Sequence, residues 1–156
     1  IFDTTVAMHK FMDNTVKMMF KYSSKLSDPY LSDPDRWQII LNNLVSNSIK
    51  FARVHADSYI HLDVAKVSDE LVVTFEDNGI GIPAAQLDSI FEMFYRATDA
   101  SAGSGLGLYI VRQTVELLGG SITVDSKTGV FTRFTIRMPF VNNAPQIYAE
   151  KSYRTA

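Results

Sequence analysis

The chain has 156 residues, of which 46% are hydrophobic, and a net charge of -2 from 15 Lys and Arg against 17 Asp and Glu. This is enough for one compact domain with its own core. A near-neutral charge without a basic run excludes the electrostatic footprint of a nucleic-acid or polybasic membrane binder. The lack of cysteine excludes disulfides, thiol nucleophiles and cysteine-based zinc sites, and fits a reducing compartment.

The N-terminal third of the chain predicts two helices. From Thr4 to Tyr22 apolar residues recur at a helical spacing, at Met8, Phe11, Met12, Val16, Met19 and Phe20. Polar residues interrupt this segment, so we expect neither a spanning helix nor a signal peptide. The polar run from Ser23 to Asp35 indicates a connector. Asp33 as cap and Pro34 in the first turn then predict a second helix, from Pro34 to Arg53.

Beyond that helix the hydrophobic period changes to alternation, which predicts strands. We expect strands over 59–64 and 71–76, a glycine-rich loop over 77–107 with a short helix near 87–94, a helix over 108–118, and strands over 121–125 and 131–138. One apolar face per element indicates a two-layer α/β sandwich with a mostly antiparallel sheet packed on helices. We expect one domain over residues 1–140 and a loosely ordered tail over 141–156.

A polar stripe borders the apolar face of the second helix, and it contains Asn43, Asn47 and Lys50. Asparagine is a mediocre helix former, so two of them four residues apart suggest a role beyond solvation, although a solvated helix side gives the same pattern. An amide oxygen there is a suitable hard ligand for Mg²⁺, which takes its other ligands from water and phosphates. Lys50, one turn further, is placed to meet a phosphate oxygen.

The strand that ends at Glu76 leads directly into Asp77-Asn78-Gly79-Ile80-Gly81-Ile82-Pro83. Glycines let the backbone approach a ligand closely, and an ionised aspartate only accepts hydrogen bonds. Adenine has an amino donor at its sixth position where guanine has an acceptor, so a single carboxylate is able to select adenine. The same residues also suit the turn of a hairpin, and the motif alone does not separate the two interpretations.

A third motif, Gly103-Ser104-Gly105-Leu106-Gly107-Leu108, begins a predicted helix, where free backbone N–H groups favour a phosphate. Glycine spacing alone is a weak signal. A Rossmann fingerprint fails because residues 97–102 do not form a strand pattern and Leu108 occupies the third glycine position. A P-loop is excluded because no Gly-Lys-Ser or Gly-Lys-Thr is present.

Four motifs in this order resemble the N, G1, F and G2 boxes of sensor histidine kinases: Asn43 to Phe51, Asp77 to Pro83, Ile90 to Arg96 and Gly103 to Leu108. The resemblance covers about Pro34 to Pro139. It implies the Bergerat ATP-binding fold that this family shares with DNA gyrase, the Hsp90 chaperones and a mismatch-repair protein. It also implies ATP and Mg²⁺ as ligands.

The resemblance assigns roles to individual residues. Asn47 would hold Mg²⁺, Asn43 and Lys50 would contact phosphates, Asp77 would receive the adenine amino group, and Arg96 would steady the γ-phosphate. The candidate catalytic residues are therefore Asn43, Lys50 and Arg96. The candidate nucleotide-binding residues are Asn43, Asn47, Lys50, Phe51, Asp77, Gly79, Gly81, Gly103, Ser104, Gly105, Leu106, Gly107 and Leu108.

The resemblance implies the catalytic domain of a protein-histidine kinase. Such a domain transfers the γ-phosphoryl group of ATP to a histidine on a separate dimerisation domain, from which it passes to a response regulator. Hydrolases of the superfamily have a glutamate base where Asn43 stands, and an amide cannot take a proton from water, so we expect poor ATP hydrolysis. His9, His55 and His61 do not match the Ser-His-Glu type motif of the acceptor histidine, so we do not expect autophosphorylation.

The sequence departs from the family pattern in two places, and the first of them leaves an alternative open. The expected lid, Ala97 to Ala102, contains no Lys or Arg, and Phe51, whose ring would lie against the adenine, stands where tyrosine is common. The alternative is a degenerate nucleotide-binding module that docks on its neighbour without kinase activity. In either case we expect a cytoplasmic, monomeric domain with no nucleic-acid partner and no direct membrane contact.

Overall fold

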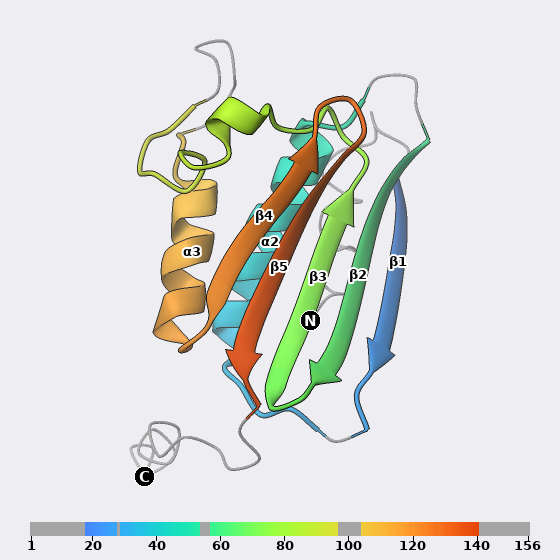
Figure 1. Cartoon of the computed structure of the whole chain (residues 1–156), viewed down its shortest axis with the longest axis vertical. Coiled ribbons are helices and arrows are strands. Elements are labelled where there is room, and N and C mark those ends of the chain that lie inside the picture. Colours follow the sequence, from blue (N-terminus) through green and yellow to red (C-terminus); the bar gives the residue numbers. More distant parts are fainter. Residues whose placement is uncertain (1–17, 28, 54–56, 97–103, 141–156) are drawn as a thin grey trace, which may run out of the picture.

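The protein is a two-layer structure in which helices cover one face of a β-sheet (Figure 1). The computed structural model describes residues 18–27, 29–53, 57–96 and 104–140. In chain order, the elements are β1 (Met18–Lys25), α2 (Pro34–Lys50), β2 (Ser58–Val67), β3 (Glu70–Asp77), the 3-10 helix η1 (Ala84–Gln86), α3 (Gly107–Leu117), β4 (Ser121–Lys127) and β5 (Phe131–Pro139).

The sheet of the described residues has five strands in the order β1-β2-β3-β5-β4. β1 runs parallel to β2, and the pairs β2–β3, β3–β5 and β4–β5 are antiparallel. Tight hairpins form two of the antiparallel pairs, because residues 68–69 join β2 to β3 and residues 128–130 join β4 to β5. The third pair, β3–β5, joins strands that are separated in the sequence by η1, α3 and β4. The prediction of a mostly antiparallel α/β sandwich is therefore confirmed.

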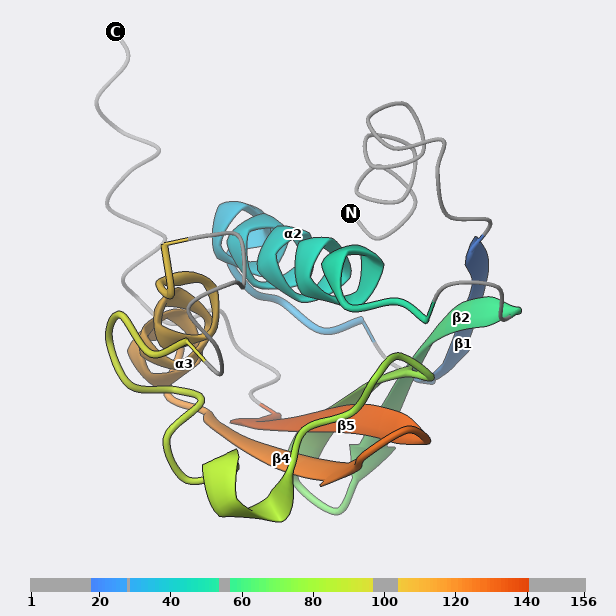
Figure 2. The ribbon, with the colours of Figure 1, turned by 90° about the horizontal axis from the view of Figure 1, so that it is seen from above.

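The core lies between the sheet and the two helices, which Figure 2 shows on the same side of the strands. Alternate residues of β2, β3 and β5 point inward, and the apolar arc of α2 packs on them. The fully buried side chains include Ile40, Leu44, Val45, Ile60, Phe75, Val111, Val115, Ile136 and Met138. This packing holds the C-terminal end of α2 over the C-terminal end of β3.

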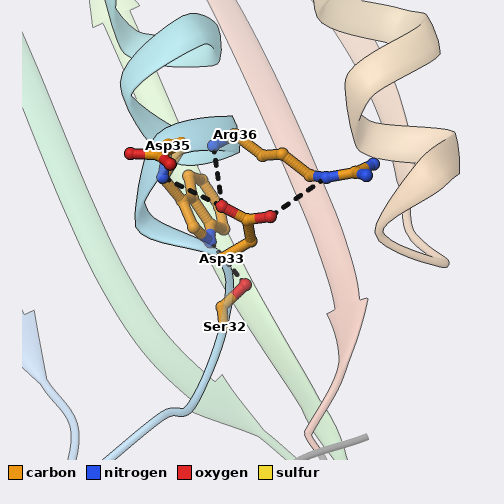
Figure 3. Close-up of polar contacts among 5 residues, drawn as sticks. Ser32, Asp33, Asp35 and Arg36 are labelled. Carbon is orange, nitrogen blue, oxygen red and sulfur yellow. Dashed lines mark hydrogen bonds and ion pairs between the residues drawn. The ribbon is translucent and has the colours of Figure 1, made fainter. Parts of the chain in front are cut away.

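The start of α2 is fixed by a polar cap, as Figure 3 shows. Asp33 Oδ1 accepts the backbone N–H groups of Asp35 and Arg36 at 3.0 and 3.2 Å, and the Arg36 guanidinium binds Asp33 Oδ2 at 3.2 Å. Burial alone would raise the pKa of Asp33, but these hydrogen bonds lower it. The indole of Trp37 donates to Ser32 Oγ at 3.0 Å. The predicted cap is confirmed, and α2 ends at Lys50 rather than at Arg53.

The predicted helix over Thr4 to Tyr22 is wrong for its last residues, because Met18 to Tyr22 belong to strand β1. Met18 and Phe20 alternate toward the core, and the whole of β1 pairs in register with β2. A local spacing that suits a helix is overridden here by the hydrogen bonds of the sheet. The remainder of the predicted helix lies outside the described residues.

The predicted short helix over Leu87 to Phe94 is also wrong. The chain forms η1 at Ala84–Gln86 and then single turns, with i to i+3 bonds such as Glu92 N to Ser89 O at 2.9 Å. Phe94 has a φ of 64°, which no right-handed helix contains.

The predicted lid and the predicted tail over 141–156 lie outside the described residues, so the domain limits stay predictions. None of the described helices is both long and apolar enough to span a bilayer.

Candidate functional site

A cavity of about 640 Å³ opens where the C-terminal half of α2, the loop after β3 and the N-terminus of α3 meet. Apart from Gly79, all described candidate residues line it. These are Asn43, Asn47, Lys50, Phe51, Asp77, Gly81, Arg96, Ser104, Gly105, Leu106, Gly107 and Leu108. Gly103 lies outside the described residues. Residues that are far apart in the sequence thus share one concave site, which is the usual form of a small-molecule site.

The asparagine stripe of α2 faces this cavity and the beginning of α3. Asn43 Nδ2 donates to Ile39 O at 2.8 Å. A Cβ atom built on Gly107 would lie 3.1 Å from Asn43 Oδ1 and 3.9 Å from Asn47 Oδ1. Two amide oxygens therefore lie at the first residue of α3, where glycine leaves room that a side chain would fill. Such oxygens are suitable hard ligands for a small divalent cation.

The buried wall of the cavity contains a carboxylate, Asp77, at the end of β3. Its side chain is 7% exposed, with Oδ2 2.7 Å from Ser48 Oγ and Oδ1 2.9 Å from the Gly79 N–H. Burial raises the pKa of Asp77, the hydrogen bonds from Ser48 and Gly79 act against that rise, and the nearby charge of Glu76 adds to it. Gly79 is thus a partner of Asp77 rather than part of the lining.

Two cations, Lys50 and Arg96, line the same cavity from more exposed positions. Lys50 Nζ lies 4.6 Å from the centroid of the Phe51 ring. Partial burial lowers the pKa of Lys50, and the positive charge of Arg96 lowers it further. Like charges held together in one cavity are stabilised by an anion, so this side of the site is suited to a negatively charged ligand.

Backbone glycines shape the third wall, at the start of α3. Gly105 has a φ of 71°, and a Cβ atom there would lie 2.7 Å from the carbonyl carbon of Phe94 and 2.8 Å from Tyr95 O. Only glycine lets the chain pass this closely and then begin α3 at Gly107. The free N–H groups of that helix end add donors and a positive dipole beside the two cations.

A network of backbone contacts braces the loop after β3 against two other elements. Ile80 N donates to Phe51 O at 3.0 Å, and Gly129 N donates to Ile80 O at 2.7 Å. Arg53 donates from Nε to Asn78 O at 2.8 Å and from Nη1 to Gly129 O at 3.0 Å. The end of α2, the loop and the β4–β5 hairpin are therefore held together, which fixes the carboxylate wall relative to the asparagine stripe.

The motifs missed part of the lining, namely Gln86, Ile110, Thr128, Thr132 and Phe134. Thr132 is 6% exposed and pairs directly with Asp77 across β3 and β5. Thr132 and Phe134 both belong to the alternate residues of β5 that point inward. A polar residue at such a core position is unusual, and this would have identified Thr132 from the sequence. Gln86 ends the short 3-10 helix η1 and Thr128 lies in a turn, so no periodicity identifies either residue.

The geometry suits a ligand with two chemically different parts. A buried carboxylate that only accepts hydrogen bonds fits a ring with a polar N–H donor. Cations, helix N–H groups and amide oxygens fit an anionic chain with a divalent cation. The apolar walls between these groups fit a flat ring.

The chain is similar in sequence to known proteins. The sequence profile of the family described as histidine kinase-, DNA gyrase B-, and HSP90-like ATPases matches residues 32–142. The signal transduction histidine-protein kinase AfsQ2 of Streptomyces coelicolor is 38% identical over 110 residues, which cover 69% of this chain and 20% of AfsQ2. The chain thus spans only about a fifth of that relative's length.

Solved structures show the same fold. The catalytic domain of the histidine kinase ThkA, in a nucleotide-free form, superposes with a TM-score of 0.74 at 22% identity over 89% of this chain and 91% of that chain. Full-length ShkA in complex with AMPPNP gives a TM-score of 0.78 at 23% identity over 92% of this chain and 30% of that chain. At these identities the likeness concerns the fold alone.

Proposed function

The chain belongs to the histidine kinase-, DNA gyrase B- and HSP90-like ATPase family, as a catalytic ATPase domain of the histidine kinase type, and from this premise we propose that it binds Mg-ATP and phosphorylates a histidine on a separate domain. The observation that best supports this proposal is the composition of the cavity. A buried Asp77 and the exposed cations Lys50 and Arg96 line the same 640 Å³ space.

ATP fits this cavity in one direction. The adenine amino group donates to Asp77 on the buried wall, and the ring lies against Phe51. The triphosphate lies toward Lys50 and Arg96, with the glycine-rich start of α3 beside it. The AMPPNP complex of ShkA, a structural neighbour, supports a nucleotide in this fold.

Mg²⁺ fits the asparagine stripe, where amide oxygens lie beside the space kept free by Gly107. Asn47 would hold the ion, with Asn43 next to it. When bound, Mg²⁺ neutralises charge that develops on the phosphates. The protein's part is to keep both amides in place, and the hydrogen bond from Asn43 to Ile39 O helps to do so.

In the transfer step, a nitrogen of the acceptor imidazole attacks the γ-phosphorus, and the bond from that phosphorus to the bridging oxygen breaks. ADP leaves with the electron pair, and the imidazole becomes a phosphoramidate after it loses its N–H proton to solvent. Lys50 and Arg96 stabilise the charge on the phosphoryl oxygens, and Asn43 contacts a phosphate without removing a proton. Because Asn43 is no base, water is a poor acceptor and intrinsic hydrolysis is slow.

The partners follow from this step. The acceptor histidine belongs to a helical dimerisation domain of the parent protein, and a response regulator receiver domain takes the phosphoryl group from it. His61, the one histidine among the described residues, lies on β2 with its ring centroid 4.1 Å from that of Tyr59, and it does not line the cavity. We place the domain in the cytoplasm, where ATP is available.

The test is transfer of labelled phosphate from γ-labelled ATP to a separately supplied dimerisation domain with an acceptor histidine. We expect acid-labile label on that domain and none on this chain. Asn47→Ala should reduce the transfer rate at least about tenfold, since a cation ligand is lost. Asn42→Ala is the matched control, because Asn42 stands on the same helix, accepts from Gln38 Nε2 at 2.9 Å and lies outside the cavity lining.

Two results would contradict the proposal. If the native chain binds ATP but transfers no phosphate, the result would indicate the degenerate module that docks on its neighbour without kinase activity. Rapid release of phosphate by the chain alone would indicate a hydrolase.

A further inference from the structure

A hydroxyl group interrupts the buried face of α2 next to the carboxylate of the cavity. Ser48 is 2% exposed and follows the core residues Leu44 and Val45 on the same helix face. A buried hydroxyl without a partner costs free energy, so a serine at such a position needs a reason. Its partner is Asp77, because Ser48 Oγ lies 2.7 Å from Asp77 Oδ2.

The two oxygens of Asp77 are held from two sides. Oδ2 accepts the Ser48 hydroxyl, and Oδ1 accepts the Gly79 N–H at 2.9 Å. One donor comes from the helix layer and the other from the loop after the sheet, so rotation of the carboxylate about its χ angles breaks one bond or the other. A carboxylate has about four acceptor sites, so it keeps capacity for a ligand donor after both contacts are made.

We infer that Ser48 is a positioning residue for base recognition: its hydroxyl fixes the orientation of the Asp77 carboxylate in the cavity wall and so contributes to the selection of a purine with an amino group at its sixth position. This inference rests on the proposed function, because it assumes that the cavity binds ATP. It adds a buried residue on α2 that acts through Asp77.

The charge of Asp77 depends on the same contact. Burial favours the neutral carboxyl group, and hydrogen bonds to the charged form oppose burial. A neutral carboxyl group has a proton on one oxygen and presents a donor as well as acceptors, so it no longer rejects guanine, whose sixth position is an acceptor. Ser48 therefore supports discrimination in two ways, through the orientation of the carboxylate and through its ionisation.

The experiment compares ATP with purine riboside triphosphate, which lacks the amino group, in calorimetric titrations at several pH values. The native chain should prefer ATP. In Ser48→Ala that preference should fall by about tenfold, the scale of one hydrogen bond to a charged group. The pH below which ATP binding is lost should also be higher in the variant than in the native chain.

Two further variants separate positioning from a general loss of stability. Ser48→Thr keeps the hydroxyl and should restore the preference for ATP. Thr114→Ala removes another buried hydroxyl, one that donates to Ile110 O at 2.7 Å on α3 and lies outside the cavity lining, so it should change stability without changing the preference.

The outcomes are distinguishable. If Ser48→Ala weakens both nucleotides equally, or changes neither, Ser48 does not position the carboxylate, and the proposed function still stands because the native chain prefers ATP. If the native chain binds neither nucleotide, both the proposed function and this inference are wrong.

Discussion

Replacement of Gly81 by alanine tests how tightly the loop after β3 is built into the cavity wall. Gly81 has a φ of 70°, and a Cβ atom there would lie 2.4 Å from Lys127 O and 2.8 Å from Thr128 Cα. Both contacts are with backbone of the β4–β5 hairpin, so no side chain can rotate away to relieve them. The loop or the hairpin has to move instead.

The free-energy cost of Gly81→Ala has two parts, and a second glycine, Gly129, separates them. A left-handed φ costs alanine about 1–2 kcal/mol, and overpacking adds about 1–3 kcal/mol, so Gly81→Ala should destabilise the protein by about 2–5 kcal/mol. Gly129 has a φ of 74° with nothing within 4 Å of a Cβ atom. Gly129→Ala should therefore show the conformational part alone, about 1–2 kcal/mol.

Urea denaturation at pH 7 measures both variants against the native chain, and calorimetry measures ATP binding under conditions where each variant is folded. We expect Gly81→Ala to bind ATP more weakly, because the displaced loop begins next to Asp77, and Gly129→Ala to bind normally. Equal free energies of unfolding for the two variants would refute the reasoning, because the close contact with Lys127 O would then have no energetic consequence.

Three further substitutions test other parts of the site. Asp77→Asn should raise the free energy of unfolding at pH 7. Burial raises the pKa of Asp77, so the carboxyl group stabilises the protein at low pH and this stabilisation is lost as the pH rises through the raised pKa. In urea denaturation at acid pH, the variant and the native chain should therefore be equally stable. Lys50→Met should weaken ATP binding at least about tenfold in calorimetry and should reduce the salt dependence of binding. Lys66→Met is the control and should not change binding, because Lys66 Nζ lies outside the cavity, 4.3 Å from the centroid of the Phe140 ring. Asp33→Ala should cost about 1 kcal/mol in urea denaturation through loss of the α2 cap without a change in ATP affinity.

Three results would contradict these expectations for Asp77, Lys50 and Asp33. A less stable Asp77→Asn at neutral pH would mean that burial does not penalise the charged carboxylate. Equal effects of Lys50→Met and Lys66→Met would mean that net charge, and not the cavity, determines affinity. An unchanged Asp33→Ala would mean that the cap does not limit the stability of α2.

Much of the fold could be predicted because local signals and tertiary packing agree. Asp33 and Pro34 start α2 where the sequence indicates, and the alternation in β2, β3 and β5 matches their inward series. β1 was missed because a parallel edge strand has no hairpin partner next to it in the sequence, and its pairing with β2 across the whole of α2 is a long-range contact.

The candidate site, like the fold, could be predicted from the sequence only in part. The motifs identified residues whose types are unusual for their element, such as the asparagines of α2, and the structure brings them to one cavity. Ser48 and Thr132 have signals of their own, because each is a polar residue at a core-facing position. Gln86 and Thr128 have none, since η1 and the β4–β5 turn, 42 residues apart in the sequence, meet at the cavity only through the fold.

The central claim, adenine recognition by Asp77, is tested most directly by calorimetric titration of the native chain with Mg-ATP and Mg-GTP, repeated with ATP on Asp77→Asn. The account predicts binding of ATP in preference to GTP, and loss of ATP binding in a variant that is folded. Equal affinity for both nucleotides, or unchanged ATP binding by Asp77→Asn, would contradict it.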